Sequence, residues 1–221
     1  MGLRGGVLPV AMLAALSVPS QARAEWSLAI YLGASHTAPT TLTLEQPAAR
    51  VHLQWHDVPF ESRSFESPQY YGYRIAWFRS PQSKIGVEAE FIHLKLYARS
   101  GALAPEVQRF SISHGLNLVL ANAVWRAGDP QRRLHLQVRA GAGVTVPHAE
   151  SEIFGIAQEQ YELSSAALQV AAGPELRLTR HIRTFAEYKL TTAAPTVSVP
   201  GGTMAGRYTS QHIAFGLGAA W

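Results

Sequence analysis

The chain has 221 residues, a net charge of +4 and no cysteine. Charged residues make up 15% of it and apolar residues 47%, which excludes a strongly basic nucleic-acid-binding protein and a domain held by disulfides. Because the chain has no cysteine for disulfides, it must be stabilised by its core, by a metal or by a closed sheet.

The first 24 residues have the features of a secretory signal peptide. Arg4 supplies the positive charge, Val7–Val18 forms an apolar core of about a dozen residues, and Ala22-Arg23-Ala24 matches an A-x-A cleavage site. The apolar core is too short to span a bilayer comfortably. We therefore predict a signal peptide over residues 1–24 and an exported domain over residues 25–221.

Eight later segments alternate apolar and polar residues with a period of two, which indicates β-strands with one apolar face. These segments are Trp26–Ser35, Tyr70–Arg79, Lys84–Tyr97, His114–Arg126, Leu134–Pro147, Ser164–Thr179, Ile182–Thr192 and Gln211–Trp221. In the third, the apolar set changes face after Phe91, which indicates a bulge or the end of the membrane part. Asn122 interrupts the apolar face of the fourth. That face, which we expect to meet lipid, contains Leu116, Leu118, Leu120 and Val124.

The connections between these strands alternate between long and short. The long ones, interpreted as loops, cover about residues 36–68, 98–113, 148–163 and 193–208. Arg50–His56 also alternates, but counting it as a membrane strand would give an odd number and break this order. Bacterial barrels have even strand numbers, short periplasmic turns and long extracellular loops. The sequence thus predicts an all-β, eight-stranded antiparallel transmembrane β-barrel in the outer membrane, with Arg50–His56 in its first loop.

Aromatic residues lie near the predicted strand ends, as the interfacial girdles of membrane barrels require. The tryptophans expected at the periplasmic rim are Trp26, Trp77, Trp125 and Trp221; the tyrosines expected at the outer rim are Tyr70, Tyr71, Tyr97 and Tyr208. Trp221 also ends the chain, and a terminal aromatic resembles the signal that the barrel-assembly machinery reads.

Charged residues of both signs fall on the faces predicted to line the lumen. They are Arg74, Glu88, Glu90, Arg139, Glu175, Arg177, Glu187, Lys189 and His212. An eight-stranded barrel is narrow enough to be filled by side chains, and buried charges must be paired. We expect one ion-pair network that includes Arg74, Glu88, Glu90, Arg139, Glu175 and His212; a narrow ion pore is the alternative.

Gly-x-Ser-x-Gly, P-loop and His-Glu-x-x-His motifs are absent from the sequence. Polar side chains gather instead at the predicted outer ends of the strands, where imidazoles and carboxylates from several loops could form a metal site. The four groups are His56, Asp57 and Glu61; His93 and Lys95; Ser111, Ser113, His114 and Asn117; and His148, Glu150 and Glu152.

Four segments, Glu25–Gly33, Ser64–Arg74, Gly86–Ala98 and Gly141–Glu150, carry a resemblance that spans most of the exported domain. Together they resemble the lipid A oxidases of rhizobial and related bacteria. The resemblance implies an eight-stranded barrel that oxidises the proximal glucosamine of lipid A to 2-aminogluconate with molecular oxygen. It implies an activity without identifying catalytic residues.

An oxidase of lipid A, or of lipopolysaccharide, needs a base, an electron acceptor and contacts with the lipid phosphate. We expect His148 or His114 as the base, because imidazole exchanges protons near neutral pH. A divalent metal ion, with His56 and Glu150 as ligands, would work with oxygen as the acceptor. His93 and Lys95, expected to face the lipid at the top of the third strand, would bind phosphate.

Two alternatives lie outside oxidation. The outer-membrane lipid A deacylases use a His-x-Ser pair with a carboxylate, whereas Ser113 and His114 are adjacent here and would point to opposite faces of a strand. The other alternative is a non-enzymatic barrel for adhesion, packing or envelope integrity. Basic residues able to bind phosphate near the outer rim would favour lipid A contact over this structural role.

Overall fold

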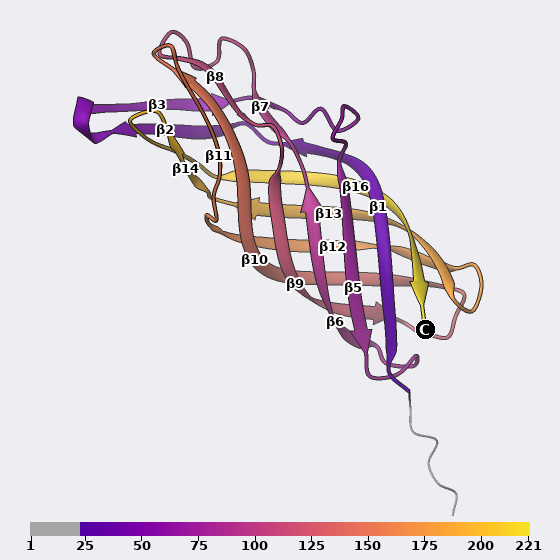
Figure 1. Cartoon of the computed structure of the whole chain (residues 1–221). Helices are drawn as coiled ribbons and strands as arrows, with labels where there is room; N and C mark the ends of the chain where they lie inside the picture. Colours follow the sequence, from indigo (N-terminus) through magenta and orange to yellow (C-terminus); the bar gives the residue numbers. More distant parts are fainter. Residues whose placement is uncertain (1–22) are drawn as a thin grey trace, which may run out of the picture.

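The computed structural model describes residues 23–221, so all but the last two residues of the predicted signal peptide lie outside the described part (Figure 1). The strands are β1 (Glu25–Thr37), β2 (Thr40–Gln46), β3 (Val51–Val58), β4 (Phe60–Glu61), β5 (Tyr71–Phe78), β6 (Ile85–His93), β7 (Leu96–Ala98), β8 (Val107–Ile112), β9 (Leu116–Ala127), β10 (Leu134–Ile153), β11 (Ile156–Tyr161), β12 (Ala166–Arg177), β13 (Ile182–Ala193), β14 (Thr196–Val199), β15 (Gly202–Gly206) and β16 (Tyr208–Ala220). A 3₁₀ helix, η1 (Pro47–Ala49), joins β2 to β3. Among the described residues, no helix is long and apolar enough to cross a membrane.

Eight strands form a closed antiparallel barrel in the order β12-β13-β16-β1-β5-β6-β9-β10, and β10 pairs back with β12. The predicted fold and strand number are confirmed. Closure satisfies the backbone hydrogen-bonding groups of every barrel strand, which is the condition for strands in lipid. The chain therefore has the architecture of a bacterial outer-membrane barrel.

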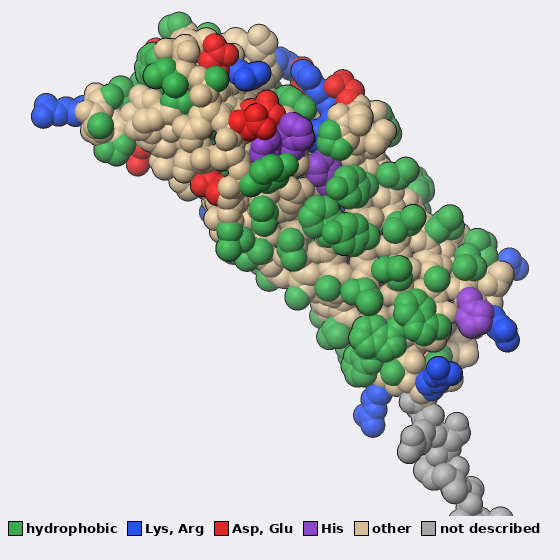
Figure 2. Space-filling model, in the orientation of Figure 1, with side chains coloured by type: hydrophobic (Ala, Val, Ile, Leu, Met, Phe, Trp, Pro, Cys, Tyr) green, Lys and Arg blue, Asp and Glu red, His purple; other side chains and the backbone are tan. Residues whose placement is uncertain are grey.

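Exposed apolar side chains cover the outside of the barrel as a broad band (Figure 2). The predicted lipid-facing phase is confirmed on β10, where Leu134, Leu136 and Val144 are exposed while Arg139 is buried. Because successive side chains of a β-strand point to opposite faces of the sheet, every second residue meets lipid.

The predicted orientation of β9 is wrong. The four residues expected to meet lipid, Leu116, Leu118, Leu120 and Val124, are buried, whereas Val119 and Trp125 on the opposite face are exposed. Asn122, on the buried face, donates to Glu90 at 2.8 Å in the lumen. The leucines point inward because the outer half of the lumen is an apolar core shared with the strands above the barrel. Members of that core include Leu116, Leu118, Leu120, Ile92, Leu94 and Leu96.

The tryptophan girdle is confirmed at one rim. Trp26 and Trp77 are cross-strand partners, and the backbones of Trp26 and Trp221 exchange two hydrogen bonds of 3.0 Å. At the other rim the prediction is wrong for Tyr70 and Tyr208, which are buried. Tyr208 packs edge-on against Phe60, with ring centroids 5.3 Å apart, so it belongs to the core above the barrel.

The four long connections, predicted as loops, contain further strands: β2, β3, β4, β8, β11, β14 and β15. As predicted, Arg50–His56 lies outside the barrel: residues 51–56 belong to β3, in a four-stranded sheet of order β14-β15-β2-β3, and Arg50 caps η1. This sheet extends beyond the barrel (Figure 1). The strand β10 continues well past the barrel and pairs there with β8 and β11. These outer strands place polar residues above the barrel.

Three cations and three carboxylates in the middle of the lumen form a closed ion-pair network. Glu187 is its centre: its carboxylate lies 3.1 Å from Arg74 and 2.6 Å from Lys189, and it also contacts Arg139. Glu88 accepts from Arg139 at 3.1 Å, and Glu90 contacts Lys189. Every member is almost fully buried, so the equal number of opposite charges is what makes the network tolerable.

The prediction of one lumen network is wrong in two members. Glu175 belongs to a separate cluster near the tryptophan rim, where Arg183 bridges it at 3.1 Å to Glu25 at 2.9 Å. His212 makes no ion pair within the described chain and instead lies 2.9 Å from the Thr191 hydroxyl. Between the two clusters a cavity of about 20 Å³ is left, room for about one water, so the lumen is filled and not an open pore.

Replacing Trp221 with aspartate is expected to impair assembly of the barrel. Trp221 is exposed at the membrane rim, where a carboxylate costs free energy that the indole does not. The folded fraction, measured by heat-modifiable migration in membranes, should fall strongly. Phe65→Asp is the control, because Phe65 is also exposed but lies in the connection between β4 and β5. Equal folded fractions in the two variants would contradict this role for the terminal residue.

Candidate functional site

The candidate site lies on the outer face of β10, directly beyond the lipid-facing band. Val144 and Val146 occupy the even-numbered, lipid-facing positions of this strand, and His148 and Glu150 continue the same face. Figure 2 shows histidine and carboxylate side chains gathered next to the outer edge of the apolar band. The same face of one long strand, β10, therefore contacts lipid in its lower part and presents His148 and Glu150 at the level of the lipid headgroups.

Four ionisable side chains converge there from three segments. His148 and Glu150 come from β10, Glu159 from β11, and His114 from the turn between β8 and β9. His148 Nε2 lies 2.9 Å from a Glu159 oxygen, and His114 Nδ1 lies 3.2 Å from a Glu150 oxygen. The two imidazole rings meet edge-on with centroids 4.6 Å apart. We call His114, His148, Glu150 and Glu159 the His/Glu cluster.

The two carboxylates of the His/Glu cluster are directly opposite each other, since Glu150 and Glu159 are cross-strand partners. Like charges in this position destabilise a sheet unless a cation lies between them. The four potential ligand atoms all lie within 4.8 Å of one another. Ligands around a transition metal with bonds of about 2.1 Å are separated by at most about 4.2 Å. Small side-chain rotations would bring all four to one ion.

The backbone next to the cluster is held by a glycine with a left-handed conformation. Gly115 has φ of +108°, and a Cβ at this position would lie 2.5 Å from His93 Nδ1. The Gly115 carbonyl accepts a hydrogen bond of 3.1 Å from the backbone N–H of His148. The turn that carries His114 is thereby attached to β10 at the site itself.

The structure brings together three of the four residues predicted for catalysis and metal binding: His114, His148 and Glu150. The predicted ligand His56 does not join them, because it lies on β3 of the separate four-stranded sheet, exposed and 3.3 Å from the Thr41 hydroxyl. Glu159 was missed. The Phe154-Gly155 pair, both with positive φ, forms a two-residue hairpin turn, and an X-Gly pair at this point was a signal that would have placed Glu159 opposite Glu150.

His93 and Lys95, predicted to meet lipid phosphate, are buried, with 4% and 3% of their surfaces exposed. His93 keeps the lipid-facing phase of β6 but is covered by the stacked ring of Tyr71, 4.9 Å away, and lies 2.9 Å from Asn117. The Lys95 ammonium donates to the Glu66 carbonyl at 2.9 Å, and burial lowers its pKa. The predicted exposure of both side chains is wrong, and their predicted phosphate-binding role gains no support.

The argument that separated Ser113 from His114 is also wrong. Both residues lie in a turn, not in a strand, and the Ser113 hydroxyl is 3.1 Å from His114 Nδ1. The same nitrogen, however, also faces Glu150. A hydrolytic triad uses one imidazole nitrogen for the nucleophile and the other for the carboxylate. The arrangement is therefore not a catalytic triad, and the deacylase alternative remains unsupported for this different reason.

No protein-family model and no curated protein matches the sequence. Among solved structures, the chain is similar to Neisserial surface protein A, with 12% identity and a TM-score of 0.45 over 89% of this chain and 98% of that one. It is also similar to the attachment invasion locus protein Ail of Yersinia pestis, with 13% identity and a TM-score of 0.43 over 90% and 99%. The outer membrane protease OmpT from Escherichia coli gives 8% identity and a TM-score of 0.48 over 89% and 97%. No functional conclusion follows from similarities of this size.

Proposed function

We propose that this protein is an outer-membrane enzyme that oxidises the proximal glucosamine of lipid A to 2-aminogluconate with molecular oxygen. The observation that supports it most is the His/Glu cluster, which two histidines and two carboxylates form just outside the lipid-facing band. Its two carboxylates are cross-strand partners, and the repulsion between them would be relieved by a cation bound at the cluster. The resemblance of the sequence to lipid A oxidases supplies the reaction.

The donor set of the cluster fits a divalent transition metal, since imidazole and carboxylate ligands suit iron, manganese, copper and zinc. His148, Glu150 and Glu159 would hold the ion, which leaves His114 available as the base. When bound, such an ion supplies a Lewis-acidic centre that helps oxygen accept electrons.

The reaction requires a free hydroxyl on the anomeric carbon of the sugar. That carbon loses a hydroxyl proton and a hydride equivalent and becomes a lactone, which water opens to the acid. Oxygen takes up the two electrons and two protons and leaves as hydrogen peroxide. His114 is half exposed and its Nδ1 is oriented by Glu150, so its other nitrogen can receive the hydroxyl proton.

The position of the cluster suits a substrate that arrives within the membrane plane. Lipid A, whose headgroup lies at the outer surface, would reach the site along the outside of β10 without leaving the bilayer. The proposal therefore includes export through a cleaved signal peptide, insertion by the barrel-assembly machinery and location in the bacterial outer membrane.

Expression in a host that lacks the activity tests the proposal. Mass spectrometry of the host lipid A should show a gain of one oxygen atom that disappears when the cells grow without air. Unmodified lipid A from aerated cells that contain correctly folded barrel would refute the oxidase function.

The alternative is a non-enzymatic barrel used for adhesion or envelope integrity. It is favoured by the four-stranded sheet β14-β15-β2-β3, which extends beyond the barrel and is separate from the His/Glu cluster. Folded barrel that leaves lipid A unchanged while promoting cell attachment would support it.

A further inference from the structure

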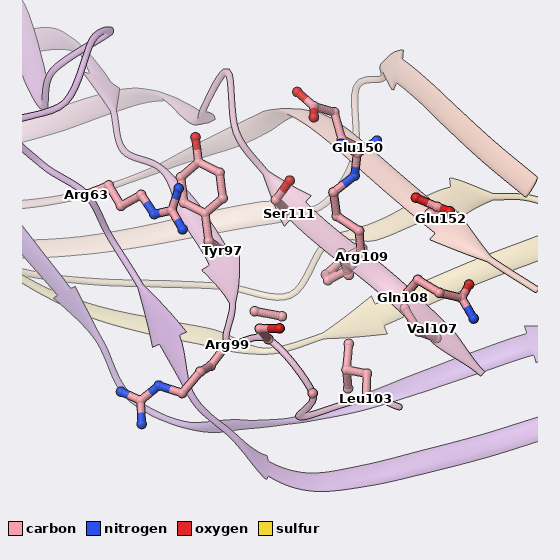
Figure 3. A pocket seen from close by; sticks show the side chains of 14 residues that line it. Arg63, Tyr97, Arg99, Leu103, Val107, Gln108, Arg109, Ser111, Glu150 and Glu152 are labelled. Carbon is pink, nitrogen blue, oxygen red and sulfur yellow. The ribbon is translucent and has the colours of Figure 1, made fainter. Parts of the chain in front are cut away.

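A second polar feature adjoins the His/Glu cluster. A cavity of about 500 Å³ lies above the barrel between β7, β8 and the outer end of β10. Glu150 lines this cavity and also belongs to the cluster. In the view of Figure 3, Tyr97 and Ser111 lie between the Arg63 side chain and those of Arg109 and Glu150. We call this cavity the arginine pocket.

Arg63, Arg99 and Arg109 line the arginine pocket, against the carboxylates of Glu150 and Glu152. Arg63 has only long contacts with carboxylates, at 3.5 Å from Glu61 and 3.9 Å from Glu66, and Arg99 lies 3.8 Å from Glu61. Arg109 makes no ion pair or side-chain hydrogen bond with the described residues. Such weakly paired guanidinium groups can still donate two parallel hydrogen bonds to an anion. Phosphate oxygens accept bonds of this geometry well.

The other walls of the pocket suit a sugar. The guanidinium carbon of Arg63 lies 4.2 Å from the centre of the Tyr97 ring, which orients this arginine. Burial raises the pKa of the Tyr97 phenol, which keeps it protonated as a donor. The Ser111 hydroxyl and the Glu152 carboxylate add a donor and an acceptor for ring hydroxyls.

We infer that the arginine pocket binds a phosphate group of a glycolipid headgroup and thereby places a neighbouring sugar at Glu150. The position of that sugar rests on the proposed function; the phosphate contact does not. Because oxidation requires a free anomeric hydroxyl, the recognised phosphate is carried elsewhere on the headgroup. The pocket thus acts in binding and selects phosphorylated over dephosphorylated lipid.

Binding to the full-length folded barrel in phosphatidylcholine nanodiscs tests this inference. The probes are lipid A with one phosphate on its non-reducing sugar, the same lipid with that phosphate removed, and inorganic phosphate. Arg63→Gln with Arg109→Gln should weaken binding of the phosphorylated lipid by about tenfold or more, since each lost bond is charge-assisted. Arg207→Gln is the matched control, because Arg207 is exposed and does not line the pocket. Heat-modifiable migration confirms that each variant is folded.

Wild-type barrel should bind the dephosphorylated lipid as weakly as the double variant binds the phosphorylated one. Equal binding of both lipids by the wild type, or an unchanged affinity in the folded double variant, would overturn the inference. Arginine-dependent binding of inorganic phosphate as tight as that of the lipid would show a free-phosphate site and overturn the glycolipid assignment. A wild-type barrel that binds the phosphorylated lipid through these arginines but never oxidises it would refute the proposed function alone.

Discussion

Replacing Glu187 with glutamine should lower the free energy of unfolding by about 3–5 kcal/mol, the typical cost of removing one partner from a buried ion pair. Glu187 contacts Arg74, Arg139 and Lys189, and all four side chains are at most 4% exposed. Glutamine leaves three cations against two carboxylates in a lumen that has little room for water. Urea unfolding in lipid vesicles, followed by tryptophan fluorescence, measures the change.

Two further variants identify charge balance as the cause. Glu45→Gln is the control, since Glu45 is exposed on β2 and its one ion pair, 3.6 Å from His52, contributes little. Adding Lys189→Met to Glu187→Gln restores two cations against two carboxylates. The double variant should therefore be more stable than Glu187→Gln alone. Equal unfolding midpoints for Glu187→Gln and Glu45→Gln would disprove the network as a source of stability.

His148→Ala should reduce lipid A oxidation by about a hundredfold or more, in the range typical for loss of a group acting directly in proton transfer or metal binding. His148 is buried and lies 2.9 Å from Glu159, so alanine removes a donor that no neighbouring imidazole can replace from the same position. Glu150→Gln and Glu159→Gln should lower retention of a divalent metal for the same reason. Lipid A product per folded barrel and metal content after dialysis are the two measurements.

His56→Ala is the matched control, because His56 is an outer histidine on β3 that does not belong to the cluster. It should keep full activity and metal content. Dialysis against a chelator should abolish oxidation by the wild type, and adding back the metal should restore it. A fully active His148→Ala barrel, or one in which His56→Ala is equally damaged, would rule out the His/Glu cluster as the centre.

Strand order and most strand orientations follow from the sequence because lipid contact imposes a strict pattern. On β10, an apolar residue at every second position from Leu134 to Val146 leaves only one face for the bilayer. On β9 the same rule fails. Leu116 and Leu118 enter the apolar core above the network, so both faces of this strand carry apolar residues, and only Asn122 and Arg126 mark the inner one.

The sequence could predict which site residues lie together only where those residues belong to the same strand. His148 and Glu150 are two positions apart on β10, so their common face is a local property of the chain. Glu159 joins them through the register of β10 with β11, and His114 through a turn that packs on His148 by way of Gly115. Those contacts depend on pairing partners that the local pattern does not specify.

The sequence alone determined that this chain forms an eight-stranded membrane barrel, because period-two hydrophobicity, tryptophans at strand ends and alternating connection lengths are local consequences of crossing a bilayer. Three features could be read only from the folded chain: the strands within the outer connections, the two separate ion clusters in the lumen, and the place of Glu159 rather than His56 in the His/Glu cluster. Each of these depends on which distant strands become neighbours, and burial and charge pairing set that choice across the whole chain.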